Sequence, residues 1–249
     1  MMNLNEGEAC AMNRAIVIGA TSGMGRELVK LLARDGWRVA ACGRRTELLA
    51  ELKSHTPGNV ITRAFDITRT SSVGRRMEEM ARALGGLDLV VISSGTGDEN
   101  ESLDYETEKR AIDTNVAGFT CAAGWAFNYF AKQGGGHLAA ISSIAGLRGS
   151  RHAPAYNAGK AYQISYLEAL RQKAGKHKAP VTVTDIRPGF VDTAMAKGEG
   201  LFWVAPVEKA ARQIYRAIRK KKPVAYVTRR WALGALLIRL IPRALYERM

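Results

Sequence analysis

The sequence has too few cysteines and histidines for a disulfide framework or a metal centre. Its three cysteines, Cys10, Cys42 and Cys121, lie far apart and form no CxxC pair, and its four histidines form no ligand cluster. Disulfide-stabilised folds and structural zinc sites are therefore excluded, and we expect a reduced, cytoplasmic protein without a metal.

Long apolar runs are also missing. No stretch approaches the roughly 18 consecutive apolar residues that a transmembrane helix needs. Residues 1–11 carry acids and lack the basic start and apolar core of a secretion signal, so a loose leader is expected there. No internal repeat, low-complexity tract or long linker divides the 249 residues. We predict one domain over residues 12–228, followed by a tail at 229–249.

Positive charge is abundant but unevenly distributed. The net charge is +14, and residues 208–249 carry +10 of it, with 12 Lys and Arg against Glu208 and Glu247. Such a segment attracts phosphates without sequence preference. Because no nucleic-acid-binding motif or row of aromatic residues accompanies the charge, nucleic acid is not an expected partner.

Short strand-like runs alternate with helix-like segments along the chain. Several of the runs are apolar almost throughout, as in strands buried on both faces, and they lie at 14–20, 37–43, 60–65, 87–93, 136–142, 181–186 and 223–227. The helix-like segments lie near 23–35, 46–54, 70–84, 105–132, 155–174 and 207–221. The alternation predicts an α/β fold with a doubly wound parallel sheet of about seven strands and helices on both faces.

The first strand leads directly into a glycine-rich turn, GATSGMG at residues 19–25. Gly19, Gly23 and Gly25 would permit a tight turn and a close approach of the backbone to a pyrophosphate, whose charge the following helix N-terminus would bind. A tight strand-to-helix connection without a ligand is the alternative. The position of the turn after the first strand of an alternating chain favours a nucleotide.

The second strand ends at Arg44 and Arg45. A carboxylate at this place would hold the ribose 2′-hydroxyl of NAD, whereas guanidinium groups suit a 2′-phosphate. NADP is therefore the expected cofactor, with Arg44 as the main contact. The alternative is a pair of solvated arginines that open the helix at Thr46.

Six segments in a fixed order make the chain resemble the short-chain dehydrogenase/reductase family from Arg14 to about Val227. They are GATSGMG, FDIT (65–68), DTNVAG (113–118), ISSIAG (141–146), YNAGK (156–160) and RPGFVDT (187–193). The resemblance implies a single-domain Rossmann fold. The chain departs from the family pattern at Ile18, at ISSG (92–95) and in continuing beyond the expected last strand. The first two departures remove no catalytic group.

The YNAGK segment places Tyr156 and Lys160 about one turn apart on a helix. Hydride transfer to a carbonyl carbon leaves an alkoxide that needs a proton, and a phenol with a pKa of about 10 suits neutral pH poorly. An adjacent ammonium group favours the phenolate, so Lys160 is expected to lower the pKa of Tyr156. Tyr156 would then be the acid in reduction and the base in oxidation. A chance YxxxK pattern is the alternative.

The resemblance implies roles for further residues. Ser143 would donate a hydrogen bond to the substrate carbonyl oxygen, with Ser142 turned away, and Asn115 would hold a water that links Lys160 to solvent. Asp66 would touch the adenine or, alternatively, cap the next helix. The implied cofactor contacts are Gly19, Thr21, Ser22, Gly23, Met24, Gly25, Arg44, Arg45, Asp66, Ile67, Ser94, Gly95, Tyr156, Lys160, Pro188, Gly189, Val191 and Thr193.

The segment at 194–206 would form a lid over the substrate. Its glycines permit movement, and Phe202 and Trp203 favour an apolar substrate unless they only pack the lid onto the core.

The tail would form a helix with two unlike sides, kinked or divided at Pro242. Arg239, Arg243 and Glu247 would lie on one side, and mainly Trp231, Leu237, Ile238, Ile241 and Leu245 on the other. A basic amphipathic segment of this kind suits peripheral contact with the inner face of a membrane. Covering the sheet, closing a neighbouring pocket and meeting another subunit are the alternatives.

The sequence thus predicts an NADP-dependent oxidoreductase for a carbonyl/alcohol pair in an apolar or lipid-like molecule. A homodimer or homotetramer, paired through the helices near 105–132 and 155–174, is implied by the resemblance. The alternative is a cofactor-binding regulatory or scaffold protein that kept the fold and lost turnover. The complete set of Asn115, Ser143, Tyr156 and Lys160 favours the enzyme, and the altered ISSG segment favours the alternative.

Overall fold

Seven parallel strands form the sheet in the computed structural model, which describes residues 13–176, 180–195 and 202–248. The strands are β1 (Arg14–Ile18), β2 (Arg38–Gly43), β3 (Val60–Ala64), β4 (Leu89–Ile92), β5 (Gly136–Ile141), β6 (Val181–Pro188) and β7 (Val224–Val227). Their order is β3-β2-β1-β4-β5-β6-β7. The predicted doubly wound parallel sheet is confirmed, and its order reverses between β1 and β4, where such sheets bind ligands.

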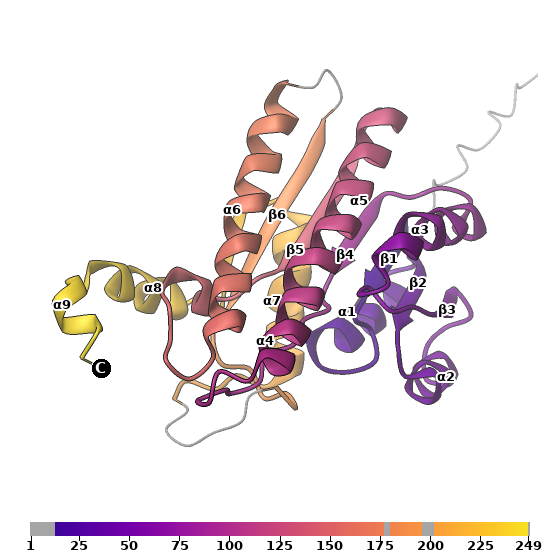
Figure 1. The fold of residues 1–249 in the computed structure, drawn as a ribbon. Helices are drawn as coiled ribbons and strands as arrows, with labels where there is room; N and C mark the ends of the chain where they lie inside the picture. The colour runs from indigo at the N-terminus through magenta and orange to yellow at the C-terminus, as the bar shows by residue number, and fades with distance from the viewer. Residues whose placement is uncertain (1–12, 177–179, 196–201, 249) are drawn as a thin grey trace, which may run out of the picture.

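Helices cover both faces of this sheet (Figure 1). They are α1 (Gly23–Arg34), α2 (Thr46–Ser54), α3 (Thr70–Leu84), α4 (Tyr105–Ile112), α5 (Phe119–Gln133), α6 (Pro154–Lys176), α7 (Val207–Arg219), α8 (Trp231–Leu240) and α9 (Arg243–Tyr246). A π-helical turn, η1 (Asp113–Gly118), joins α4 to α5, so the segment expected as one helix near 105–132 is interrupted. A 3-10 turn, η2 (Ile144–Leu147), precedes α6.

Each face of the sheet has its own hydrophobic core because side chains alternate along a strand. Ile16 and Val90 pack into the core with α3, α5 and α6, whereas Val17 and Val91 pack into the core with α1, α2 and α7. All four side chains are fully buried. Burial on both faces explains why the strand sequences are apolar at successive positions.

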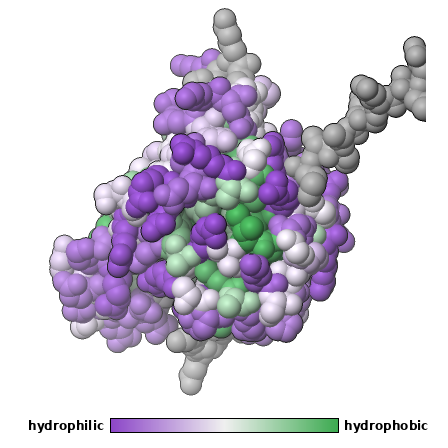
Figure 2. All heavy atoms as spheres, turned by 90° about the vertical axis from the view of Figure 1, so that its right-hand side faces the viewer, coloured by the Kyte–Doolittle hydropathy of each residue, from purple (hydrophilic) through white to green (hydrophobic). Residues whose placement is uncertain are grey.

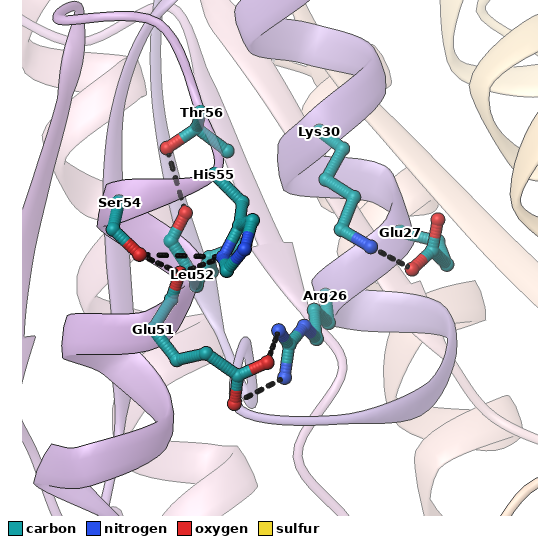
Figure 3. Close-up of polar contacts among 8 residues, drawn as sticks. All are labelled: Arg26, Glu27, Lys30, Glu51, Leu52, Ser54, His55 and Thr56. Carbon is teal, nitrogen blue, oxygen red and sulfur yellow. Dashed lines mark hydrogen bonds and ion pairs between the residues drawn. The ribbon is translucent and has the colours of Figure 1, made fainter.

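An ion pair joins the first two helices beside the glycine turn. Arg26 of α1 donates to Glu51 of α2 at 2.7 Å, and Figure 3 shows the two side chains meeting between the helices. Arg26 holds the pKa of the Glu51 carboxyl below its usual value. Since exposed pairs add little stability, the main consequence is positional: α2, which starts directly after Arg45, is tied to the helix that follows the glycine turn.

The tail differs from the predicted amphipathic helix. It forms two helices, and Pro242 precedes the second. Trp231, Gly234 and Ala235 of α8 are buried, but Leu237, which was expected on the same apolar side as Trp231, is 54% exposed. The prediction was wrong because α8 is apolar on two opposite sides, and only one of them packs on the protein.

Figure 2 shows the side on which β3 and α2 lie in Figure 1, and hydrophilic residues cover most of it around a smaller hydrophobic patch. No helix in the described ranges is long and apolar enough to cross a membrane. The described residues also contain no cluster of three or more His, Cys, Asp or Glu side chains that could hold a metal ion. The expected leader at 1–11 lies outside the described residues.

A buried histidine in the sheet should make stability depend on pH. His137 Nε2 of β5 pairs with the Thr184 hydroxyl of β6 at 2.8 Å, and burial lowers the pKa of His137 from 6.5 to about 4. Unfolding therefore takes up a proton between these values, so stability falls as the pH drops from about 6.5 to about 4. We expect His137→Gln to lose this contribution, at most roughly 3 kcal/mol, in urea unfolding at pH 7 and pH 4.5. An unchanged pH dependence in the variant would contradict it.

Candidate active site

The carboxyl ends of the strands border a cleft in two adjoining parts. The larger part, of about 810 Å³, extends from the glycine turn to Tyr156. The smaller part, of about 310 Å³, extends from Tyr156 to the tail helices. Gly95, Tyr156 and Thr193 border both parts, so the tyrosine stands where the two parts meet.

Most of the expected cofactor residues border the larger part. They are Gly19, Thr21, Ser22, Gly23, Met24, Arg44, Arg45, Asp66, Ile67, Ser94, Gly95, Tyr156 and Thr193. Lys160, Pro188, Gly189 and Val191 border the smaller part. Gly25 packs beneath the turn, where an added Cβ would lie 2.2 Å from the Gly19 carbonyl oxygen.

The glycine turn is pinned between β2 and the segment after β4. The N–H groups of Gly19 and Ala20 both donate to the Cys42 carbonyl, at 2.9 and 2.8 Å. Gly19 has a φ of +90°, and a Cβ there would lie 2.5 Å from Ser94 N, so only glycine fits. The Ser94 hydroxyl beside it is buried without a hydrogen-bond partner in the described part of the chain. A ligand in the cleft could supply this missing bond, so the residues present fit a nucleotide.

Of the two arginines after β2, Arg45 is the one fixed at the glycine turn. Its Nη2 donates to Thr21 Oγ1 at 2.7 Å and to Ser22 Oγ at 2.8 Å. Arg44 is exposed at the edge of the cleft. Arg44 was expected to be the main contact, but Arg45 has the closer relation to the turn.

Asp66 shapes the turn before α3 but does not cap that helix, whose N-cap residue is Arg69, and its contact with the adenine stays a prediction. Its Oδ1 accepts hydrogen bonds from the Thr68 N–H at 3.0 Å and the Thr68 hydroxyl at 2.8 Å, which shapes the turn before α3. Partial burial opposes ionisation, but these bonds and the charges of Arg44 and Arg69 hold the pKa of Asp66 below its usual value. The residue also borders the cleft, so an ionised carboxylate stands near the arginines.

Tyr156 lies in the first turn of α6, opposite Ser143, which directly precedes the 3-10 turn η2 after β5. Ser143 Oγ accepts from Ala145 N at 3.1 Å and donates to the Pro188 carbonyl at 3.4 Å. Burial raises the pKa of Tyr156 above its usual value, and a hydrogen bond with Ser143 acts in the opposite direction. The expected lowering by Lys160 is therefore wrong for the protein alone. Because burial outweighs the Ser143 hydrogen bond, the pKa of Tyr156 is raised and the phenol stays protonated at neutral pH.

Lys160 is held by two oxygen acceptors. Its Nζ donates to the Ile141 carbonyl at 2.9 Å and to Gln163 Oε1 at 3.0 Å, and lies 5.8 Å from the centre of the Tyr156 ring. Burial lowers the pKa of Lys160 to about 8, although Asp185 raises it. Two of the three ammonium protons are thus engaged, which leaves one for a group in the cleft.

Asn115 has a different link to Lys160 from the one expected. Its Oδ1 accepts from Thr96 N at 3.1 Å and its Nδ2 donates to the Thr96 carbonyl at 2.6 Å, which fixes the loop after β4. Its backbone carbonyl accepts from Gln163 Nε2 at 2.9 Å. The water that Asn115 was expected to hold, linking Lys160 to solvent, stays a prediction, and the Gln163 side chain connects Lys160 to the Asn115 carbonyl directly. Gln163 was missed because a glutamine in a helix gives no signal of its own in the sequence.

Ser142 is turned away from Tyr156. Its hydroxyl donates to Asp185 Oδ1 at 2.5 Å inside the sheet, and Arg187 donates to the other oxygen of the same carboxylate at 2.7 Å. Each of these side chains is buried. Ser143 is therefore the serine of the pair that meets the tyrosine.

Comparison with known proteins places this geometry in a family. The model of the short chain dehydrogenase family matches residues 13–201. The chain belongs to that family. An uncharacterized oxidoreductase of Myxococcus xanthus is 36% identical over 186 residues, which cover 73% of each chain. One of Mycobacterium tuberculosis is 28% identical over 237 residues and covers 92% of each chain.

Solved structures support the fold of this short-chain dehydrogenase. A short-chain dehydrogenase/reductase from Burkholderia phymatum, in complex with NAD, has a TM-score of 0.81 at 18% identity and covers 91% of this chain and 92% of its own. A short chain dehydrogenase from Bacillus anthracis has a TM-score of 0.77 at 19% identity, with 86% and 94% covered. At these identities the likeness shows the fold alone.

The tail closes the smaller part of the cleft in this short-chain dehydrogenase. Ile238 of α8 and Tyr246 of α9 both border it. Arg148, which follows η2, donates to the carbonyls of Ile238 at 3.2 Å and Ile241, and its guanidinium lies 4.8 Å from the centre of the Tyr246 ring. Of the alternatives for the tail, closing a neighbouring pocket is therefore the one that the structure shows.

Two close approaches shape the site further. A Cβ at Gly97 would lie 2.3 Å from the Tyr156 ring, so the loop after β4 passes directly against the tyrosine. A Cβ at Gly189 would lie 2.1 Å from the Trp231 ring, so α8 begins against the segment after β6. Gly97 and Trp231 were not among the expected site residues. The part of the expected lid at 196–201 lies outside the described residues.

Proposed function

We propose that this short-chain dehydrogenase is an NADP-dependent oxidoreductase for a carbonyl/alcohol pair, with Tyr156 as general acid and base. The observation that carries the proposal is the position of Tyr156 at the border of both parts of the cleft, next to Ser143 and Lys160, which border the smaller part. A nucleotide in the larger part and a substrate in the smaller part would both reach the tyrosine.

The side chains divide the work of reduction. When bound, NADPH supplies the hydride that forms the new C–H bond. Ser143 donates a hydrogen bond to the carbonyl oxygen, where negative charge develops, and Tyr156 gives its proton to the same oxygen. Burial keeps the pKa of Tyr156 above its usual value, so the phenol carries its proton at neutral pH. Reduction requires this protonated form at the start. Oxidation of an alcohol would need the phenolate.

NADP is favoured over NAD by the charge beside the glycine turn. Arg45 is fixed on Thr21 and Ser22, and Arg44 stands at the same edge of the cleft. A 2′-phosphate there would be met by two guanidinium groups and two hydroxyls, a set that suits phosphate geometry. The NAD in the Burkholderia phymatum structure concerns that protein.

An apolar substrate is favoured by the walls of the smaller part. Ile144, Phe190, Val191 and Ile238 border it, and Trp231 packs on Phe190 with 5.5 Å between the ring centres. Consumption of NADPH over ketones and aldehydes of increasing chain length tests the function. Turnover that rises with chain length would support it. NADPH binding without any turnover would instead favour the regulatory or scaffold alternative.

We also propose that α8 contacts an anionic membrane surface. Four exposed leucines, each more than half exposed, recur on it at helical spacing: Leu233, Leu236, Leu237 and Leu240. The +10 charge of residues 208–249 favours a negative surface over a second copy of the chain, which would bring like charges together. Ile238 on the opposite side of α8 borders the smaller part of the cleft, so a lipid-like substrate would enter beside the membrane.

Replacing leucines of this row should weaken vesicle binding. We expect Leu236→Gln with Leu240→Gln to lower sedimentation with phosphatidylglycerol vesicles at least about 10-fold at low salt, since buried apolar area is lost. Leu103→Gln, at another leucine that is 64% exposed, is the matched control. Equal binding by all three proteins would contradict the contact. A leucine-dependent dimer without vesicle binding would assign the row to a second copy.

Pairing of subunits through α5 and α6 stays a prediction. The two helices lie side by side in Figure 1, and the hydroxyls of Thr120 and Tyr162 join them at 2.7 Å. The mass of the protein in solution, measured by light scattering, distinguishes the proposed homodimer or homotetramer from a monomer.

A further inference from the structure

Gln163 connects Lys160 to the π-helical turn, and the proposed reaction gives it no role. Its Oε1 accepts from Lys160 Nζ at 3.0 Å, and its Nε2 donates to the Asn115 carbonyl at 2.9 Å. An ammonium group can only donate hydrogen bonds, so the amide oxygen must face Lys160. Gln163 is 1% exposed, and both of its partners are buried as well. The amide is thus held at both ends in a closed space.

The π-helical turn η1 makes the Asn115 carbonyl available for this contact. Backbone N–H groups at the end of the turn bond to the carbonyls of Thr114 and Val116, on either side of Asn115. The wider i to i+5 spacing of such a turn skips one carbonyl. Since the carbonyl of Asn115 is buried, it needs a donor from outside the helix, and Gln163 provides it.

An amide in this place differs from a water in one decisive property. Water accepts and donates, reorients freely and can pass a proton along a chain of hydrogen bonds. A primary amide is neither an acid nor a base near neutral pH, and this one cannot rotate without losing both contacts. The link between Lys160 and Asn115 therefore fixes positions without conducting a proton.

We propose that Gln163 is a positioning residue that directs Lys160 toward the cleft and closes the proton route between Lys160 and Asn115. The inference rests on the proposed function. In each reduction, the O–H bond of Tyr156 breaks as its proton goes to the alkoxide oxygen. Water in the cleft then returns a proton to the phenolate. The position of Tyr156 at the border of both parts of the cleft supports this route, because the tyrosine itself faces the cleft.

The ionisable groups around Lys160 are Tyr156 on its own helix and Asp185 on β6. Asp185 is not a close partner of the ammonium group, because its two oxygens accept from Ser142 and Arg187. The side chain that accepts a hydrogen bond from the lysine is therefore the neutral Gln163 amide, and a change at Gln163 should alter the proton affinity of Lys160.

The first test needs no turnover. The pKa of Lys160 is measured by NMR of cofactor-free protein with ¹³C-labelled lysine, and its signal is assigned by its loss in Lys160→Arg. Wild type should titrate near the pKa of about 8 that burial imposes. Gln163→Glu should raise this pKa by about 1 or more through its charge, and Gln163→Leu should lower it. Identical values in all three proteins would overturn the positioning role.

The second test follows the proton. We expect Gln163→Leu to lower kcat about 10-fold with little change in the carbonyl KM, since a displaced lysine affects the proton donor more than substrate binding. Gln163→Glu should move the alkaline limb of the pH profile of kcat to higher pH, together with the pKa of Lys160.

In mixtures of H₂O and D₂O, the rate of wild type should show one transferring proton. Gln163→Ala, which leaves room for a water between polar groups, should show more than one.

Tyr162→Phe is the matched control on the same helix. It removes a partly buried contact between α5 and α6, the hydrogen bond to Thr120, without touching Lys160, and should leave the pKa of Lys160 and the number of transferring protons unchanged. Several transferring protons in wild type would overturn the closed route. If Gln163→Leu does not fold, the comparison of the Lys160 pKa between Gln163→Glu and wild type decides whether Gln163 positions the lysine. If the pKa responds as expected but wild type reduces no carbonyl, the proposed function and the proton route fail, while the positioning of Lys160 stands.

Discussion

Tyr156→Phe is expected to lower kcat for carbonyl reduction by about 10³-fold, while NADPH binds with a dissociation constant within about 2-fold of wild type. The phenol is the proposed proton donor, and Tyr156 borders both parts of the cleft. Phenylalanine keeps the ring, so its packing against Gly97 is retained. NADPH oxidation measures turnover, and the quenching or transfer of protein fluorescence measures binding.

The control for this substitution lies six residues further along α6. Tyr162→Phe removes the same atom from the same type of side chain, but that hydroxyl bonds Thr120 and does not border the cleft parts described above. It should keep nearly full activity. A Tyr156→Phe enzyme with more than about a tenth of wild-type kcat would show that another group donates the proton. Equal losses in both variants would indicate a general effect of altering α6.

The fold could be predicted because its signals are local and repeated. Apolar runs such as 14–20 and 87–93 read as buried strands, and the structure places their residues in the two cores. The glycine turn could be predicted too, because Gly19 directly follows the first strand. The structure explains the glycine, since a Cβ at Gly19 would collide with the backbone of Ser94. Periodicity and glycine spacing act within a few residues and need no knowledge of distant contacts.

The details of the site depend on contacts between segments far apart in the chain. Gln163 meets Asn115 across 48 positions, and Arg148 meets Ile241 across 93, so neither contact has a pattern in the sequence. The pKa of Tyr156 was expected to fall because of Lys160, but burial, which follows from tertiary packing, raises it. The exposure of the α8 leucines could not be predicted either. Because this helix is apolar on two opposite sides, its sequence does not show which side packs on the protein.

Replacing both arginines after β2 should convert the cofactor preference. We expect Arg44→Ala with Arg45→Ala to raise the NADPH dissociation constant about 100-fold and to leave that for NADH within about 2-fold, since each charge-assisted contact to a phosphate contributes roughly 1.4 kcal/mol or more. Isothermal titration calorimetry with both cofactors measures the two constants. The NADPH affinity of wild type should also fall with added salt, and that of the variant should fall less.

The single variants separate the two arginines. Arg45 is anchored by Thr21 and Ser22, so it loses little side-chain freedom on binding, and Arg45→Ala should cost more affinity than Arg44→Ala. Arg75→Ala with Arg76→Ala is the control for the loss of charge. It removes two exposed arginines that pair with Glu79 on α3, away from the glycine turn, and so removes the same charge as the double variant at Arg44 and Arg45. If this control weakened NADPH binding as strongly, net charge rather than a 2′-phosphate site would set the affinity. Equal affinity of wild type for NADH and NADPH would contradict the NADP preference directly.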